Sequence, residues 1–107
     1  MFTRVVEIRT KQGKTRDFSA TLNEKVLPIL RNQPGFVDEI TLFSNTEPDR
    51  ILALSFWQSE QDAQRYHNDQ YHTVVNHLQP LLETQPHVQT FNVDTSTTHH
   101  IAKGKAA

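Results

Sequence analysis

Four segments of the chain carry the hydrophobic pattern that is typical of β-strands. Their residues are β-branched or aromatic, and they alternate with polar residues or form a short apolar run. The segments are residues 2–10 (FTRVVEIRT), 36–44 (FVDEITLFS), 50–57 (RILALSFW) and 87–94 (HVQTFNVD). The second and third are separated only by NTEPD at 45–49, which predicts a hairpin.

Two further segments carry the longer period of amphipathic helices. In residues 15–32, Phe18, Leu22, Val26, Ile29 and Leu30 recur at helical spacing, and Pro28 should kink or shorten the last turn. A second helix is expected to begin after Ser59, with Asp62 completing an acidic capping box, and to end at the prolines of LQPLLETQP (78–86).

This order of elements, βαββαβ, predicts an α+β fold of the ferredoxin-like type. Two helices should cover one face of a four-stranded antiparallel sheet. We expect one domain over residues 1–94, followed by a polar C-terminal tail at 95–107 that is disordered or docked on a partner.

The strand at 50–57 predicts a partner for the sheet. ILALSFW is almost continuously apolar, so both of its faces favour burial, whereas the helices cover only one. The prediction is a homodimer packed sheet to sheet, which would form a dimeric α/β barrel. The alternative is that Leu52, Leu54 and Phe56 lie under the helices and the other face stays modestly exposed.

Composition excludes several classes of function. Eleven Lys and Arg balance twelve Asp and Glu, so we expect neither nucleic-acid nor anionic-membrane binding. The longest apolar run is too short to span a bilayer, and no signal segment precedes Thr3, so a cytoplasmic protein is expected. The absence of cysteine excludes disulfides and thiolate chemistry, and three glycines are too few for a nucleotide-binding loop.

The stretch RYHNDQYHTVVNHL (65–78) contains three of the six histidines. His67, His72 and His77 are five residues apart, and each step turns about 140° around a helix, so they cannot converge on one metal ion. We therefore expect no metal site.

The direction of these histidines depends on whether the helix is continuous. A straight helix would turn His67 toward the core and His72 toward water. A break at Asn68–Asp69, a pair that bonds readily to its own backbone, would reset the phase and could turn His72 inward beside Tyr71 and Val75. Periodicity alone leaves both possibilities open.

The sequence resembles the antibiotic biosynthesis monooxygenase family of small dimeric α/β barrels. The resemblance rests on VVEIRTKQGK near the start, VLPILRNQPGFV at the first helix–strand junction, and LALSFWQSEQDAQRYHNDQYH, and it covers residues 2 to 94. It implies oxidation of phenols or quinols by O₂ without metal, flavin or haem as cofactor. A related branch of the family degrades haem, but its characteristic Trp and His fall on Tyr66 and Asn76 here, and its first-strand Asn falls near Glu7.

The resemblance also implies a pocket between the second helix and the sheet. Deprotonating a phenol needs a base, for which histidine is suited, and donors for the oxyanion, for which tyrosine and asparagine are suited. The predicted catalytic residues are His72 as base and Tyr66 as donor. Because the resemblance implies an inward His72, it favours the break near Asn68–Asp69. The predicted pocket residues are Asn76, Trp57, Tyr71 and Val75, although a buried Trp57 could instead belong to the core.

The sequence and the resemblance lead to three alternative functions. The first is a cofactor-independent monooxygenase acting on a small phenolic or quinol aromatic substrate. The alternative is a non-catalytic ligand-binding or stress-related dimer of the same fold. The third is haem binding or degradation.

Overall fold

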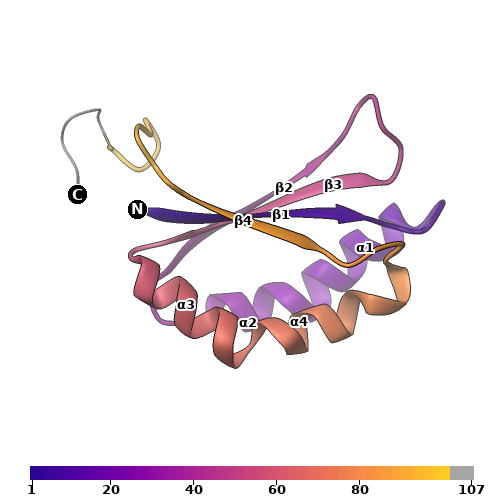
Figure 1. Ribbon diagram of the computed structural model, residues 1–107, viewed down its shortest axis with the longest axis horizontal. Helices are drawn as coiled ribbons and strands as arrows, with labels where there is room; N and C mark the ends of the chain where they lie inside the picture. Colours follow the sequence, from indigo (N-terminus) through magenta and orange to yellow (C-terminus); the bar gives the residue numbers. More distant parts are fainter. Residues whose placement is uncertain (102–107) are drawn as a thin grey trace.

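A four-stranded antiparallel sheet with helices on one face organises the chain (Figure 1). The computed structural model describes residues 1–101. Along the sheet the strands lie in the order β2-β3-β1-β4, so the hairpin is extended by the first and last strands of the chain. The strands are β1 (Phe2–Arg9), β2 (Phe36–Phe43), β3 (Arg50–Trp57) and β4 (His87–Asn92). The predicted ferredoxin-like α+β fold is confirmed.

The first predicted helix is divided into three parts by a π-helical turn. It consists of α1 (Thr15–Thr21), the π-helical turn η1 (Leu22–Val26) and α2 (Leu27–Arg31). Pro28 has no N–H to donate to the carbonyl of Glu24, so the regular α-helical ladder cannot run through this point. The irregularity therefore lies before the last turn, whereas the last turn itself, which was expected to be kinked or shortened, is regular α-helix to Arg31.

The second predicted helix also divides, into α3 (Glu60–Asp69) and α4 (Tyr71–Leu78), and a 3₁₀ turn η2 (Gln79–Leu81) follows. Its start is capped as predicted: the Ser59 hydroxyl accepts the N–H of Asp62 at 3.2 Å and donates to the Asp62 carboxylate at 3.0 Å. None of the helices in residues 1–101 is long and apolar enough to cross a membrane.

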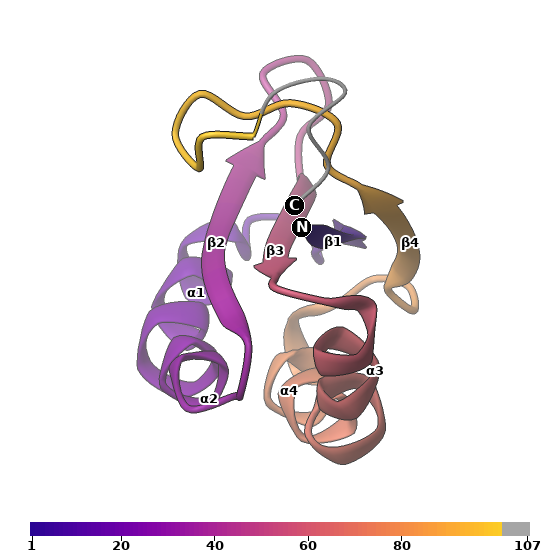
Figure 2. The ribbon, with the colours of Figure 1, turned by 90° about the vertical axis from the view of Figure 1, so that its left-hand side faces the viewer.

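Alternate residues of the central strands form the sheet side of the hydrophobic core. Arg4, Val6 and Ile8 of β1 pair with Ser55, Ala53 and Ile51 of β3, and these side chains face the helices. The buried helical residues that cover them are Phe18, Leu22, Val26, Leu30, Ala63, Tyr66, Val74 and Leu78. Figure 2 shows the two helical arms, the first formed by α1, η1 and α2 and the second by α3 and α4, side by side beneath the sheet.

The opposite face of the sheet carries a group of large apolar side chains and is not covered by any helix of the described chain. Leu52, Leu54 and Phe56 lie on it, so the alternative that places them under the helices is wrong. Ile40, Leu42 and Phe91 lie on the same face and are 42%, 46% and 50% exposed. We call this surface the outer face.

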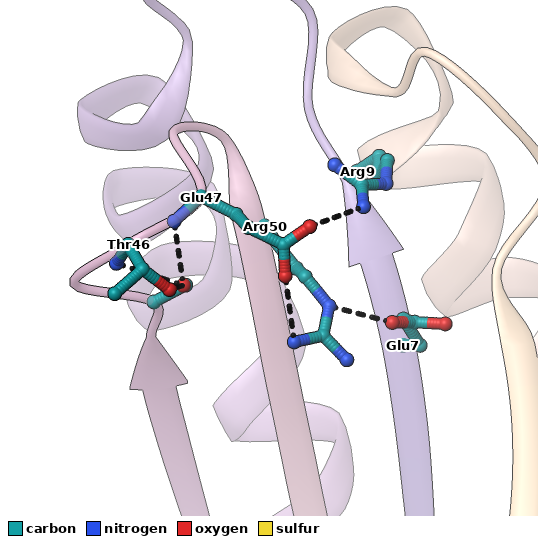
Figure 3. Close-up of polar contacts among 6 residues, drawn as sticks. Glu7, Arg9, Thr46, Glu47 and Arg50 are labelled. Carbon is teal, nitrogen blue, oxygen red and sulfur yellow. Dashed lines mark hydrogen bonds and ion pairs between the residues drawn. The ribbon is translucent and has the colours of Figure 1, made fainter.

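A charged cluster holds the end of the β2–β3 hairpin against β1 (Figure 3). Glu47 accepts hydrogen bonds from Arg9 at 3.0 Å and from Arg50 at 3.1 Å. Arg50 also donates to Glu7 of β1 at 2.7 Å. The hairpin is thus joined to β1 through two carboxylates, those of Glu47 and Glu7, and two guanidinium groups.

After β4 the chain turns back over part of the outer face (Figure 2). Ser96 and Ile101 exchange two backbone hydrogen bonds. The His99 ring lies 6.0 Å from that of Phe56, and its Nε2 lies 3.7 Å from the Asp38 carboxylate. Residues 95–101 of the predicted tail therefore contact the chain's own sheet; the rest of the tail lies outside the described residues, and the domain boundary at residue 94 stays a prediction.

Candidate active site

Arg4 is a buried cation in the middle of the sheet. Its side chain, 3% exposed, points from β1 toward the helices. Within residues 1–101 its guanidinium forms no ion pair with a carboxylate, although several other arginines do. Arginine is rarely buried without an anion, because removing its charge from water is costly. This position therefore needs an explanation.

Three side chains of the second helical arm surround the guanidinium. Its central carbon lies 5.1 Å from the ring centroid of Tyr66 and 4.5 Å from that of Tyr71, both within cation–π distance. One terminal nitrogen lies 3.1 Å from Nδ1 of His67. Arginine can only donate, so Nδ1 must accept, and the imidazole is the neutral tautomer with its proton on Nε2.

A stack of aromatic rings fixes these groups in place. Tyr66 stacks on Trp57 at 5.1 Å, and His67 stacks on Tyr71 at 5.2 Å. Trp57 is fully buried and donates its indole N–H to the Ser55 hydroxyl at 2.9 Å. Trp57 therefore supports Tyr66 from behind.

The surroundings set the protonation states of the site at neutral pH. Burial raises the pKa of Tyr66 to about 12, although the neighbouring Arg4 guanidinium opposes this change. Burial also raises the pKa of Tyr71, again against Arg4. Burial and the charge of Arg4 lower the pKa of His67. The site thus combines a cation, two protonated phenols and a neutral imidazole.

Arg4 borders two spaces, which we call the closed cavity and the open hollow. The closed cavity, about 50 Å³, lies in the core between the sheet and the helices. Its polar border is formed by Arg4, Ser55, Tyr66 and Tyr71, and Val75 is among its apolar residues. It can hold only one or a few water molecules.

The open hollow, about 310 Å³, lies between α3 and the strands β1 and β4. It is lined by Phe2, Arg4, Glu60, Ala63, Gln64, His67, Val88 and Thr90. Its volume is at the lower end of small-molecule sites, so it is the space that can receive an aromatic ring. A ligand there would lie against the Arg4 side chain.

The predicted break in the histidine stretch is confirmed, but it falls at Gln70, where the backbone leaves the helical region. From this restart Tyr71, Val74, Val75 and Leu78 share one face at helical spacing and turn inward. His72 and Asn76 occupy the other side and are exposed. The predicted inward orientation of His72 and the predicted pocket position of Asn76 are therefore wrong.

Of the other predicted site residues, Tyr66, Tyr71 and Val75 line the closed cavity, and Trp57 lies behind Tyr66 in the core. Sequence analysis missed Arg4 and the contact of His67 with it. A signal was present: Arg4 is in phase with Val6 and Ile8, so strand alternation places it on the helix-facing side. Among residues 1–101, no three His, Asp or Glu side chains are grouped so that they could hold a metal ion.

The fold recurs in solved structures of low sequence identity. SnoaB, a cofactor-independent oxygenase from Streptomyces nogalater, is 14% identical, with a TM-score of 0.74 over 90% of this chain and 95% of its own. A MhuD variant, solved with two manganese protoporphyrin IX molecules per active site, is 16% identical, with a TM-score of 0.76 over 91% of this chain and 98% of its own. A conserved protein from Methanosarcina mazei Go1 is 17% identical, with a TM-score of 0.69 over 85% of this chain and 91% of its own.

These likenesses show a shared fold. No curated protein sequence matches the chain. A family model does: antibiotic biosynthesis monooxygenase matches residues 1–91, which is most of the chain and includes every element from β1 into β4. The chain therefore belongs to the antibiotic biosynthesis monooxygenase family.

Proposed function

We propose that this protein is a cofactor-independent monooxygenase that oxidises a small phenolic or quinol aromatic with O₂. The observation that carries the proposal is the buried guanidinium of Arg4, which has aromatic rings on its helix side and no carboxylate partner in the described chain. A cation that is held in place and shielded from water can stabilise an oxyanion that forms during the reaction.

The chemistry begins with ionisation of the substrate. A phenol reacts slowly with O₂, whereas its phenolate can give up one electron and then combine with the reduced oxygen at a ring carbon. A phenol with a C–H para to its hydroxyl plus O₂ gives a para-quinone plus water, so atoms and electrons balance without an added reductant. The protein has to favour the phenolate and exclude water around it.

The residues present can meet both requirements. Arg4 would stabilise the phenolate oxygen, and the apolar side chains of Phe2, Ala63 and Val88 would surround the ring in the open hollow. Tyr66 and Tyr71 border the closed cavity, keep their hydroxyl protons at neutral pH and hold the guanidinium between their rings and the sheet by cation–π contact.

A dimer would complete the fold. We propose that the outer face packs on the same face of a second copy, because Ile40, Leu42 and Phe91 are each more than two-fifths exposed there. This arrangement is the dimeric α/β barrel expected from the sequence.

Haem degradation has less support. The two helical positions of that branch carry Tyr66 and the exposed Asn76 here. Glu7, near the first-strand position, pairs with Leu52 on the outer face, away from Tyr66.

The test is oxygen uptake with a panel of naphthoquinols, anthrones and haem, using the wild type, Arg4→Met and the exposed control Arg16→Met. We expect uptake with at least one quinol or anthrone, a loss of at least about 100-fold in Arg4→Met, and little change in Arg16→Met. Binding without oxygen uptake would favour the non-catalytic alternative. A Soret shift with haem, followed by its breakdown, would favour the haem branch.

A further inference from the structure

We propose that His67 accepts the substrate proton in this site, in exchange for the hydrogen bond that it receives from Arg4. The inference rests on the proposed function, since it concerns how a bound phenol is ionised. It gives the role of base to a different histidine from the one that the family resemblance suggested.

Two contacts hold the His67 ring at the edge of the open hollow. Its plane stacks on Tyr71 at 5.2 Å with an interplanar angle of 21°. Its Nδ1 lies 3.1 Å from a terminal nitrogen of Arg4. Since Arg4 and His67 both line the hollow, a hydroxyl group that reaches Arg4 also comes close to Nδ1.

The resting state of His67 is that of a base. The groups facing it are Arg4 from β1, Tyr71 from α4 and Glu60, which lines the same hollow from α3. Burial and the adjacent cation both favour the neutral imidazole by lowering its pKa. Arg4 thus keeps the ring unprotonated until the bound phenol gives up its proton.

The proton transfer is balanced within the site. The phenol O–H bond breaks and an N–H bond forms at Nδ1, while Arg4 redirects its own N–H from Nδ1 to the new oxyanion. The electron pair of the O–H bond stays on oxygen, and the total charge of the site does not change. The transfer needs an oxygen at ordinary hydrogen-bond distance, about 2.6–3.2 Å, from both groups.

His72 does not have these properties. Both histidines are exposed, but His72 borders neither the closed cavity nor the open hollow. Its ring is near only the Thr73 hydroxyl, at 3.5 Å. His72→Ala is therefore a control on the same helical arm.

The experiment uses 4-nitrophenol as probe, under anaerobic conditions, because its phenolate is coloured and no turnover is needed. At about pH 6 the free probe is mainly protonated, so an increase in phenolate absorbance on binding reports ionisation in the site. Titration calorimetry in two buffers of different ionisation enthalpy gives the number of protons released.

We expect the wild type to bind the phenolate at about pH 6 and to release almost no proton, since His67 retains it. Phenolate absorbance should fall at least about fivefold in His67→Ala and in His67→Gln. The Gln variant keeps a hydrogen-bond acceptor for Arg4 but has no base. The phenolate that remains should be accompanied by release of about one proton. His72→Ala should behave as the wild type does.

Wild-type ionisation and proton retention that survive in both His67 variants would overturn the assignment, as would a wild type that does not bind the probe as phenolate. A loss in His72→Ala equal to that in His67→Ala would also overturn it. Oxygen uptake is measured separately. Intact probe ionisation without oxygen uptake on any phenol would contradict the monooxygenase proposal and leave the role of His67 in place.

Discussion

Phe43 and Phe91 are equally exposed, at 50%, but their side chains lie on opposite faces of the sheet. Phe43 pairs with Ile51, which is fully buried beneath the helices. Phe91 pairs with Thr3, which pairs in turn with Phe56 on the outer face. The two side chains provide a matched test of which face is covered by a second copy.

We predict that Phe91→Glu weakens dimerisation by at least tenfold, about 1.4 kcal/mol, because a dimer would then bury an unpaired carboxylate. Phe43→Glu should leave it unchanged. Light scattering of the wild type should give about twice the chain mass of 12.4 kDa. A monomeric wild type, or equal weakening by both substitutions, would contradict the sheet-to-sheet dimer.

Ser55→Ala should destabilise the fold by about 1–3 kcal/mol, because it leaves the buried indole N–H of Trp57 without its acceptor. Trp57 is the only tryptophan in the chain, so its fluorescence reports urea unfolding directly. Ser19→Ala, on the partly exposed side of α1, should change the free energy of unfolding by no more than about 0.5 kcal/mol. Equal effects of the two substitutions would mean that the Trp57–Ser55 bond contributes nothing of its own.

Arg4→Met should leave the free energy of unfolding unchanged or raise it by up to about 2 kcal/mol, although it should lower the proposed activity at least about 100-fold. An apolar side chain of similar length replaces a buried charge that has no carboxylate partner in the described chain. Urea midpoints of the wild type and the variant test this. A loss of more than about 2 kcal/mol would show that Arg4 has a structural role in the core.

Two carboxylates should give pH dependences of opposite sign. The hydrogen bond from Arg9 holds the pKa of Glu47 below 4.5, so its contribution to stability is present above that pH and is lost as the pH falls through the folded-state pKa. Burial raises the pKa of Glu39 above 4.5, so stability should decrease as the pH rises from 4.5 through its folded-state pKa.

Urea midpoints measured between about pH 3 and 7 test both signs. Glu47→Gln should flatten the loss of stability in acid. Glu39→Gln should stabilise the protein relative to the wild type, and this gain should be largest near pH 7, where Glu39 is ionised in the wild type. If both variants shifted the profile in the same direction, one of the two assignments would be wrong.

The sequence contains enough information for the elements and their order, because alternation, helical spacing and the Ser59 cap are local signals. The direction of His72 was not predictable in this way. Moving the restart of a helix by one residue rotates every later side chain by about 100°, and the break fell at Gln70 instead of at Asn68–Asp69. That choice depends on how Val74 and Leu78 pack against the core.

Arg4 was missed for a different reason. The alternation of β1 does place Arg4 on the same side as Val6 and Ile8. A charged residue in a strand is nevertheless ordinarily expected to point to solvent. Its burial depends on Tyr66 and Tyr71, which lie more than 60 residues away in sequence and approach it only in the folded chain.

The segment that crosses the outer face has a thermodynamic consequence for assembly. His99 already occupies area over Phe56 and beside Asp38 that a second sheet would need. If these contacts stay within one chain, their free energy opposes association, and removing residues 95–107 would tighten the dimer. If the segment crosses to the other subunit, the same contacts link two chains, and removing it would loosen the dimer. Whether the dissociation constant of the dimer falls or rises on truncation therefore shows whether the segment competes with the second copy or binds to it.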